Sequence, residues 1–252
     1  MPDVFNCTVL SVEQISNTTY DMRVLAPEIC GESRPGMFVH VKCGELLLRR
    51  PISICDADGD CLRLVIDRRG DGTKWLTERK KFDVIDILGP LGRGFDLSGG
   101  RLLAVGGGIG APPMLYAAKR AKSADCVLGF RSAENVILLK DFGGVCGEVG
   151  IATDDGSLGY KGYVSGLVKL RLEKGSFDRV LACGPTAMLK SVWEVCREYG
   201  APLQVSLEER MGCGVGACLV CACKTASRTG EERYSHVCKD GPVFDAGEVV
   251  WQ

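Results

Sequence analysis

Near its C-terminal end the sequence reads Cys213-Gly-Val-Gly-Ala-Cys218-Leu-Val-Cys221, and a fourth cysteine, Cys238, follows after a longer gap. The spacing C-x4-C-x2-C with a distant fourth cysteine is the plant-type ligand set of a [2Fe–2S] cluster. Glycine visits positive φ without steric cost, so the glycines between these cysteines let the loop wrap tightly and point N–H groups at sulfur. The pattern therefore predicts a [2Fe–2S] cluster bound by Cys213, Cys218, Cys221 and Cys238.

A zinc site, a disulfide framework and free thiols are the alternatives for these cysteines. Structural zinc sites usually carry two short Cys-x-x-Cys-like pairs, whereas here three cysteines share one glycine-rich loop. We therefore favour the cluster and interpret Cys223 as a non-ligand. The chain has 14 cysteines, and those outside the ligand set are scattered through predicted strands and helices. Scattered thiols are typical of a reducing compartment, so we expect a cytoplasmic location.

The charge balance argues against two classes of partner. The formal net charge is −1, which gives no reason to expect a nucleic acid or an anionic membrane. The N-terminus carries no signal-peptide pattern, and no apolar run approaches the ~18–20 residues that span a bilayer. We therefore expect no nucleic acid and no membrane among the partners. The two histidines, His40 and His236, receive no functional assignment.

The first 98 residues alternate apolar and polar side chains in short stretches, such as Phe5–Leu10 and Met37–Lys42, and glycine and proline separate the stretches. Several short strands at this spacing predict an antiparallel barrel or sandwich. We assign residues 1–98 to this first domain.

Two places in the first domain are candidate phosphate sites. One is Arg50-Pro51-Ile52-Ser53, where an arginine and a hydroxyl can hold a phosphate and a neighbouring polar edge. The other follows the strand Val65-Ile66-Asp67, where Gly72-Thr73 opens a helix that we expect to start near Thr73. A solvated strand end and a plain helix cap are the structural alternatives. The two sites together favour a bound dinucleotide.

Residues 99–205 alternate strands and helices, which predicts a parallel doubly wound sheet. Its first strand ends in glycines, including Gly107, Gly108 and Gly110, before a helix with prolines in its first turn. Such a turn lets the backbone approach a pyrophosphate. Cys183-Gly184 ends a later strand at the edge where ligands bind in these sheets. A helix is expected over residues 133–142. Residues 206–252 form the third, cluster-binding domain, whose small core metal binding is expected to complete.

Taken together, these motifs resemble the ferredoxin–NADP reductase superfamily over the whole chain. The four cysteines and the stretch Val237-Cys-Lys-Asp-Gly-Pro-Val-Phe244 resemble the electron-transfer subunits of type 1B dihydroorotate dehydrogenases. The resemblance implies a FAD-binding barrel, a NAD-binding domain and a small [2Fe–2S] domain. It implies these FAD contacts: Arg50, Pro51, Ile52, Ser53, Val65, Ile66, Asp67, Gly72 and Thr73. It implies these contacts around the nicotinamide nucleotide: Gly107, Gly108, Gly110, Cys183 and Gly184.

The resemblance also implies a function. Dihydroorotate is oxidised at FMN in a partner subunit, and electrons pass through the cluster and FAD of this chain to NAD+, in pyrimidine biosynthesis. A heterotetramer of two plus two chains is the family expectation. One feature leaves the nucleotide open: Arg131 follows the strand ending at Phe130, where an acidic ribose contact is typical of NAD sites. The resemblance favours NAD, and the arginine leaves NADP as the alternative.

Two other functions compete with this one. The chain is also similar to NAD(P)H-linked reductase subunits that serve a different partner, such as a sulfide dehydrogenase, a hydrogenase or a ferredoxin:NADP oxidoreductase. A regulator that senses redox state through its cluster is a third hypothesis, from a non-enzymatic class. It predicts neither FAD nor NADH oxidation, and the two nucleotide-type regions argue against it.

Overall fold

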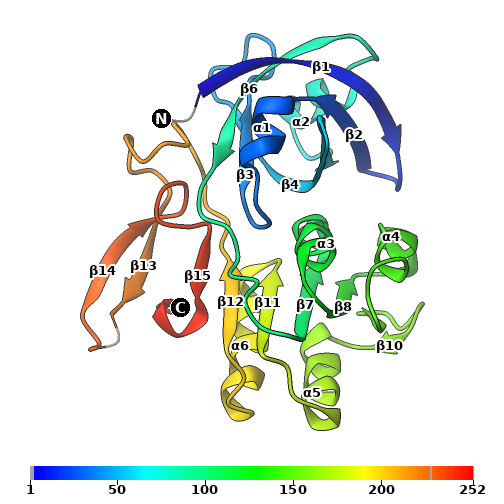
Figure 1. The fold of residues 1–252 in the computed structure, drawn as a ribbon, viewed down its shortest axis with the longest axis vertical. Coiled ribbons are helices and arrows are strands. Elements are labelled where there is room, and N and C mark those ends of the chain that lie inside the picture. The colour runs from blue at the N-terminus through cyan, green and yellow to red at the C-terminus, as the bar shows by residue number, and fades with distance from the viewer. Residues whose placement is uncertain (1–2, 228, 252) are drawn as a thin grey trace.

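The upper part of the molecule in Figure 1 is a closed antiparallel β-barrel. The computed structural model describes residues 3–227 and 229–251. Side chains alternate along the strands: in the last one every second residue from Ile85 to Leu91 is buried. The strands pair in the order β1-β2-β5-β4-β3-β6. Their bounds are β1 Asp3–Gln14, β2 Thr19–Leu25, β3 Phe38–Val41, β4 Arg50–Asp58, β5 Cys61–Asp67 and β6 Val84–Leu91, with helices α1 Pro27–Glu32 and α2 Asp71–Thr77.

The lower part is an open sheet with strand order β10-β9-β8-β7-β11-β12-β15. Every pairing in it is parallel except that between β12 and β15. The strands are β7 Leu102–Gly107, β8 Ala124–Phe130, β9 Val149–Thr153, β10 Tyr160–Lys161, β11 Arg179–Cys183, β12 Leu203–Ser206 and β15 Val243–Asp245. The helices are α3 Ala111–Arg120, α4 Leu139–Gly143, α5 Val164–Lys174 and α6 Thr186–Glu198, with short 3-10 turns η1 Gly108–Gly110, η2 Ala133–Asn135 and η3 Ala246–Glu248.

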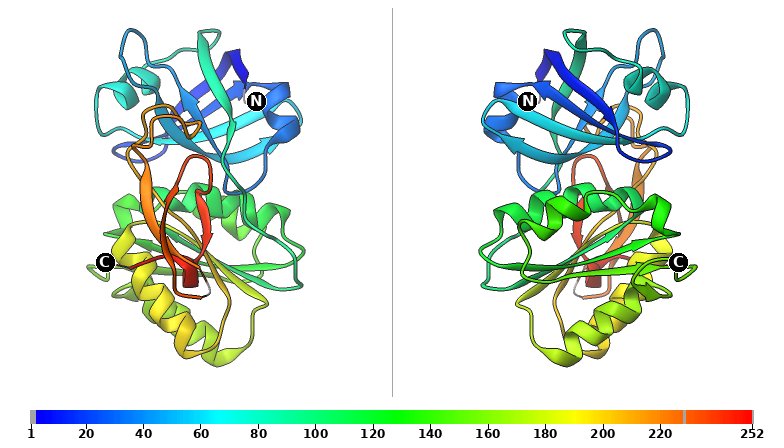
Figure 2. Two further views of the ribbon diagram at one scale, coloured as in Figure 1. Left: turned by 90° about the vertical axis from the view of Figure 1, so that its left-hand side faces the viewer. Right: turned by 90° about the vertical axis from the view of Figure 1, so that its right-hand side faces the viewer.

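Both faces of the sheet are covered, as the near-continuous apolar strands require. Leu102 and Ala104 of β7 pack with α3 on the face toward the barrel, whereas Leu103 and Val105 pack with α5 and α6 on the other face. Figure 2 shows α3 between the sheet and the barrel. The predicted fold, an antiparallel barrel followed by a doubly wound parallel sheet, is confirmed.

The C-terminal segment forms the hairpin of β13 (Ala222–Ala226) and β14 (Glu232–His236) and then returns to the sheet as β15. Its Cys221, Val237 and Phe244 share one core with the sheet and with Phe38 and Leu91 of the barrel. The cluster segment is therefore built onto the other two parts. The proposed limits of the three domains, 1–98, 99–205 and 206–252, stay a prediction.

One local expectation was wrong. The helix expected over residues 133–142 is broken into η2 and α4, because Leu138 adopts a left-handed φ of 60° before α4. The helix expected to start near Thr73 is α2, which begins at Asp71 with Gly70 as its cap and has Thr73 in its first turn. Among the described residues, no helix is both long enough and apolar enough to cross a membrane.

A buried ion-pair network joins the barrel to the sheet domain. Arg63 of β5 contacts Asp21 of β2 at 2.8 Å and Asp141 of α4 at 2.5 Å. The Arg63 side chain is 8% exposed, so its charge is stabilised mainly by these carboxylates. On the same face, Lys119 of α3 pairs with Asp56 of β4, and the Tyr116 hydroxyl donates to the Ser33 carbonyl at 3.1 Å.

We expect Asp21→Asn to lower the free energy of unfolding by about 3 kcal/mol, because it leaves the buried Arg63 charge with one carboxylate fewer. Urea titration followed by circular dichroism measures the change. The matched control is Glu78→Gln, which removes a solvent-exposed pair with Arg68 and is expected to cost less than ~1 kcal/mol. Equal effects of the two variants would contradict a structural role for the Arg63 network.

Candidate functional site

The four cysteines of the predicted ligand set lie in the C-terminal segment as two close pairs, and among the described residues no three cysteine, histidine or carboxylate groups are gathered in metal-binding geometry. The Sγ atoms of Cys221 and Cys238 are 3.2 Å apart, and the Cys213 N–H lies 3.4 Å from the Cys218 Sγ. The Gly216 N–H donates to the Cys238 Sγ at 3.1 Å and so connects the two pairs. Gly214 and Gly216 have φ of 76° and 82°, which L side chains rarely adopt. The loop therefore wraps around the sulfurs as the sequence predicts.

Backbone N–H groups aimed at sulfur change the ionisation of the first cysteine. Burial raises the pKa of Cys213, but N–H groups of Val215, Cys218 and Ala217 donate to its Sγ and bring the pKa down to about 6. Burial and the adjacent Cys221 raise the pKa of Cys238 to about 12. One sulfur is thus prepared as a thiolate, and a second loses its proton only when a cation joins the site. This is the donor chemistry that a thiolate-bound metal centre requires.

The cluster loop reaches the molecular surface. Cys218 is exposed, whereas Cys221 and Cys238 are buried. Large apolar side chains stand exposed beside it: Val215 at 43%, Leu219 at 58% and Val220 at 57%. A contiguous patch of exposed apolar residues is typical of an interaction surface.

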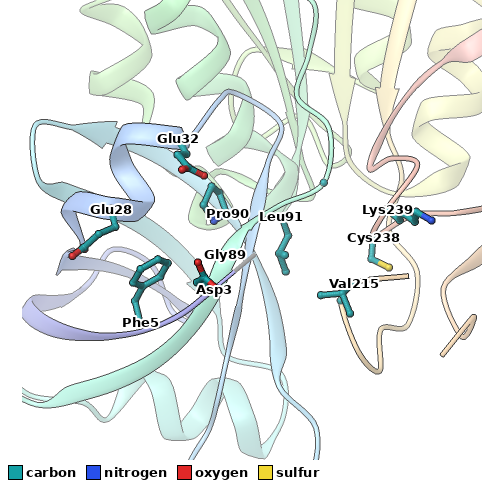
Figure 3. A pocket seen from close by; sticks show the side chains of 12 residues that line it. Asp3, Phe5, Glu28, Glu32, Gly89, Pro90, Leu91, Val215, Cys238 and Lys239 are labelled. Atoms are coloured by element: carbon teal, nitrogen blue, oxygen red, sulfur yellow. The ribbon is translucent and has the colours of Figure 1, made fainter. Parts of the chain in front are cut away.

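A cavity of about 410 Å³ separates this loop from one end of the barrel. Figure 3 shows Asp3, Glu28 and Glu32 on the barrel side, with Cys238 and Lys239 across the gap. The cavity brings carboxylates of the barrel near a cluster ligand, which places acidic groups at the rim of the same surface.

The two candidate phosphate sites of the barrel meet in space. A Cβ added at Gly72 would lie 2.4 Å from the Arg50 Nε, so the arginine packs directly on the first turn of α2. Arg50 bonds the Leu48 carbonyl at 2.6 Å, and no carboxylate in the described part of the chain pairs with it. Its neighbour Arg49 is held by Asp86 at 2.6 Å. Arg50 is therefore the arginine of the pair that is available to an anion.

The Thr73 hydroxyl is already engaged in the turn before α2. It accepts from the N–H groups of Arg69 at 2.9 Å and Gly70 at 3.1 Å, and it lies 3.0 Å from the Gly70 carbonyl. Its observed role is to shape the turn that presents Gly72 to Arg50.

A larger cavity of about 980 Å³ lies between the barrel and the carboxyl edge of the sheet. Of the predicted nucleotide and flavin residues, Asp67, Gly107, Gly108 and Gly184 line it. Val65 and Ile66 are buried in the cores on either side of the barrel wall. Of the remaining predicted residues, Pro51 is exposed, Ser53 is half-buried and Ile52 is buried in the barrel core.

Gly110 and Cys183 act behind this cavity. A Cβ at Gly110 would lie 2.2 Å from the Cys183 carbonyl oxygen, so only glycine allows the turn after β7 to touch the end of β11. Cys183 is 1% exposed, and burial raises its pKa to about 12. Its thiol is therefore neutral. Cys183 directly precedes Gly184, which lines the cavity.

Several residues outside the predicted contact set also line the large cavity, and of these the sequence pointed to Arg131, as a possible 2′-phosphate contact, and to Asp154, at a strand end. Arg131 and Asp154 follow β8 and β9, and Tyr163 and Glu208 also contribute to the lining. The signal for Asp154 was its place at the end of a strand on the ligand-binding edge. The cavity therefore holds a cationic and an anionic group at the ends of neighbouring strands. His40 is buried beside Gly214 of the cluster loop. No sequence signal marked it.

Residues 208–250 match the family described as the iron–sulfur cluster binding domain of dihydroorotate dehydrogenase B. A protein of Geobacillus thermodenitrificans, named dihydroorotate dehydrogenase B (NAD(+)), electron transfer subunit, is 45% identical, over 96% of this chain and 97% of its own length. A protein of the same name from Desulforamulus reducens is 41% identical and both chains are covered completely. The chain belongs to this family. The family prediction made from its motifs is therefore confirmed.

Solved structures agree with the fold of this electron-transfer subunit family. A chain from the structure of an NADH-dependent reduced ferredoxin–NADP oxidoreductase, studied for flavin-based electron bifurcation, superposes with a TM-score of 0.86. It is 31% identical, with 97% of this chain and 90% of that chain covered. A ferredoxin NADP+ reductase from Neisseria gonorrhoeae with bound FAD and NADP has a TM-score of 0.65 at 17% identity, covering 78% and 92% of the two chains.

We expect Cys213 of the metal-free chain to be alkylated fast at neutral pH, because its pKa is lowered to about 6. A lowered pKa means that the thiolate forms as the pH rises through about 6, so the rate should level off above pH 7. Iodoacetamide labelling under anaerobic conditions, followed by peptide mass spectrometry, measures the rate at each pH. The variant Cys213→Ser should lose the fast phase. A midpoint near the ordinary thiol pKa would show that the N–H groups do not act on this sulfur.

Proposed function

We propose that this chain is the electron-transfer subunit of an NAD+-linked dihydroorotate dehydrogenase in pyrimidine biosynthesis. In this role it carries a [2Fe–2S] cluster and FAD, and it passes electrons from an FMN-containing catalytic subunit to NAD+. The full-length similarity to relatives of that name is the observation that carries the proposal. The large cavity and the surface cysteine loop, both adjoining the barrel, support it.

The cysteine loop fits a two-iron cluster. Cys213 with Cys218, and Cys221 with Cys238, would each hold one iron, because each pair already lies together. The loop N–H groups of Val215, Gly216 and Ala217 donate to the sulfurs and offset negative charge on them. The buried side chains of Cys221 and Cys238 keep water away from one half of the site.

The barrel fits FAD. Arg50 would contact its pyrophosphate together with the N-terminal turn of α2 at Gly72, and Thr73 shapes that turn. Ser53, which is half-buried on β4, would hydrogen-bond near the flavin edge. The strand segments Pro51-Ile52 and Val65-Ile66-Asp67 would line the flavin largely through their backbone.

The sheet edge fits a nicotinamide nucleotide. Gly107 and Gly108 leave the backbone open toward the cavity, and Gly110 holds this turn against the strand end at Cys183-Gly184. We propose NAD as the nucleotide. Asp154 supports this choice, because a carboxylate on the cavity wall disfavours a 2′-phosphate, whereas Arg131 taken alone would accommodate one.

FAD exchanges two electrons with a nicotinamide and single electrons with an iron–sulfur cluster, which is why a flavin belongs between the other two groups. The contribution of this chain is positional. Its barrel packs against the sheet on one side and the cluster loop on another. Glycine backbone lines the cavity at this edge, and the neutral Cys183 thiol behind it would add no charge next to a nucleotide.

The catalytic subunit would dock at the cluster loop. The exposed Val215, Leu219 and Val220 beside Cys218 offer an apolar contact there, and the carboxylates of the neighbouring cavity offer a charged rim. We extend the proposal to a heterotetramer of two plus two chains.

A second candidate is a reductase subunit for another partner, such as a sulfide dehydrogenase, a hydrogenase or a ferredoxin:NADP oxidoreductase. The solved ferredoxin–NADP oxidoreductase chain, with 31% identity over 97% of this chain, favours it. Both functions need the same cavity and the same cysteines, so only the partner separates them.

The complex of this chain with a dihydroorotate dehydrogenase catalytic subunit is the material for the test. Anaerobic dihydroorotate should bleach the flavin and cluster absorption bands, and added NAD+ should then be reduced. The mass of the purified complex checks the two-plus-two composition. If NADH bleaches the bands and dihydroorotate does not, the electron-transfer role stands and the partner is a different one.

We expect Gly72→Ala to weaken FAD binding at least tenfold, because the new Cβ would occupy the space of the Arg50 side chain. Fluorescence titration of the flavin-free protein with FAD measures the dissociation constant. Gly70→Ala is the matched control, since no atom lies within 4 Å of a Cβ there and its φ of −154° suits any residue.

The reciprocal variant separates the two cofactor sites. Cys218→Ser should abolish the visible absorption of the cluster while FAD stays bound, because the flavin site lies on the barrel. Loss of both cofactors from a folded Cys218→Ser protein would contradict separate sites. An unchanged FAD affinity of the Gly72→Ala protein would contradict a role for Arg50 in FAD binding.

A further inference from the structure

His40 points away from the interior of the barrel and toward the cluster segment. Its strand neighbours Val39 and Val41 belong to the barrel core, and successive side chains of a strand face opposite sides. His40 is paired with Pro51 on β4 and with Leu88 on β6. It is 0% exposed, and Gly214 of the cluster segment packs against the ring.

The ring is in contact with the residue that follows the first cluster ligand. A Cβ added at Gly214 would lie 2.7 Å from the His40 Nδ1 and 3.2 Å from Leu91. Gly214 also has a φ of 76°, so both its conformation and its closeness to the ring require glycine. The chain therefore keeps the Cys213-Gly214 segment as near to this imidazole as a backbone can come.

Neither ring nitrogen of His40 has a hydrogen-bond partner of good geometry within residues 3–227 and 229–251. Burial and the charge of Arg49 lower its pKa, and the nearby backbone groups of Cys213 and Arg49 oppose this only in part. An imidazole carries at least one N–H in either protonation state. Leaving a buried polar group without a hydrogen bond is costly. An apolar residue would fill this position at lower cost unless the N–H has a use.

The ring occupies the junction between the two cofactor sites. On one side is β4 with the flavin motif, whose Pro51 is the direct cross-strand neighbour of His40. On the other side is the loop whose N–H groups of Val215, Ala217 and Cys218 converge on the Cys213 sulfur. The contact between His40 and Gly214 is where the barrel wall meets that loop.

We propose that His40 is a positioning residue for electron transfer, which anchors the first cluster ligand, Cys213, to the flavin-binding wall of the barrel. This inference rests on the proposed function. In the cluster-loaded protein the ring N–H donates to the Cys213 carbonyl. That bond holds the loop in the shape in which its N–H groups point at the Cys213 sulfur. Those N–H groups stabilise the extra negative charge of the reduced cluster, so the anchor raises the reduction potential.

The test is a redox titration of the cluster in the purified chain, followed by electron paramagnetic resonance, for three variants. His40→Leu removes the N–H donor and should lower the equilibrium constant for cluster reduction about tenfold, which is 59 mV for a one-electron couple. His40→Gln keeps an N–H donor, so its equilibrium constant for cluster reduction should stay within about threefold of that of the unaltered protein. Leu88→Ala is the packing control. Leu88 is the cross-strand partner of His40 on β6, and it packs against the core that contains Cys221 and Cys238. This variant should lower the stability of the protein and leave the equilibrium constant for cluster reduction within about threefold of that of the unaltered protein.

Each outcome decides for or against the anchor. A shift in the leucine variant that glutamine restores supports it, as does a leucine variant that fails to assemble the cluster while the glutamine variant assembles it. Equal shifts or equal failures in the leucine and glutamine variants would assign His40 a packing role only. Unchanged potentials in both would also overturn the proposal.

The same titration separates this inference from the function on which it rests. If the unaltered chain binds no [2Fe–2S] cluster, the proposed function fails before His40 is examined. If it binds the cluster and dihydroorotate is not the electron donor, the potentials of the His40 variants still decide the anchor.

Discussion

The antiparallel addition of β15 to β12 is the interaction on which the arrangement of the three sites depends. Cys238 lies only a few residues before Val243, where this strand begins. The main-chain hydrogen bonds of β15 therefore fix the fourth cysteine against the sheet edge. Between Cys238 and β15, the Gly241 carbonyl accepts a hydrogen bond from the N–H of Arg93 at 2.6 Å. Arg93 lies in the segment that connects the barrel to the sheet. One short segment thus ties the cluster site to both larger parts.

This arrangement explains why a small cysteine-rich segment can be ordered. Its own hairpin, β13 and β14, buries little, but Cys221, Val237, Cys238 and Phe244 share the core that fills one face of the sheet. The hydrophobic stabilisation of the segment therefore comes from packing its side chains into the core of a larger domain. Metal binding is then needed to neutralise and hold the sulfurs, more than to create the core around them.

Charged residues have two different environments in this structure. Arg63 carries a buried charge across the barrel and sheet interface, where two carboxylates balance it. Around the large cavity, by contrast, Arg131, Asp154 and Glu208 stand without the close packing of a core. Charge joins the two domains in the first case, and in the second we propose that it selects the nucleotide.

Much of the fold and of the candidate site could be predicted from residue patterns, because those patterns reflect local physical rules. The cysteine spacing indicates the cluster, the alternation of side chains indicates the barrel, and the glycines after β7 indicate a nucleotide turn. Contacts between distant segments could not be predicted in this way. The packing of Arg50 on Gly72, the Arg63 to Asp141 bridge and the burial of His40 against Gly214 all join residues far apart in the chain. They depend on how the barrel, the sheet and the cluster loop dock, and no local propensity encodes that docking.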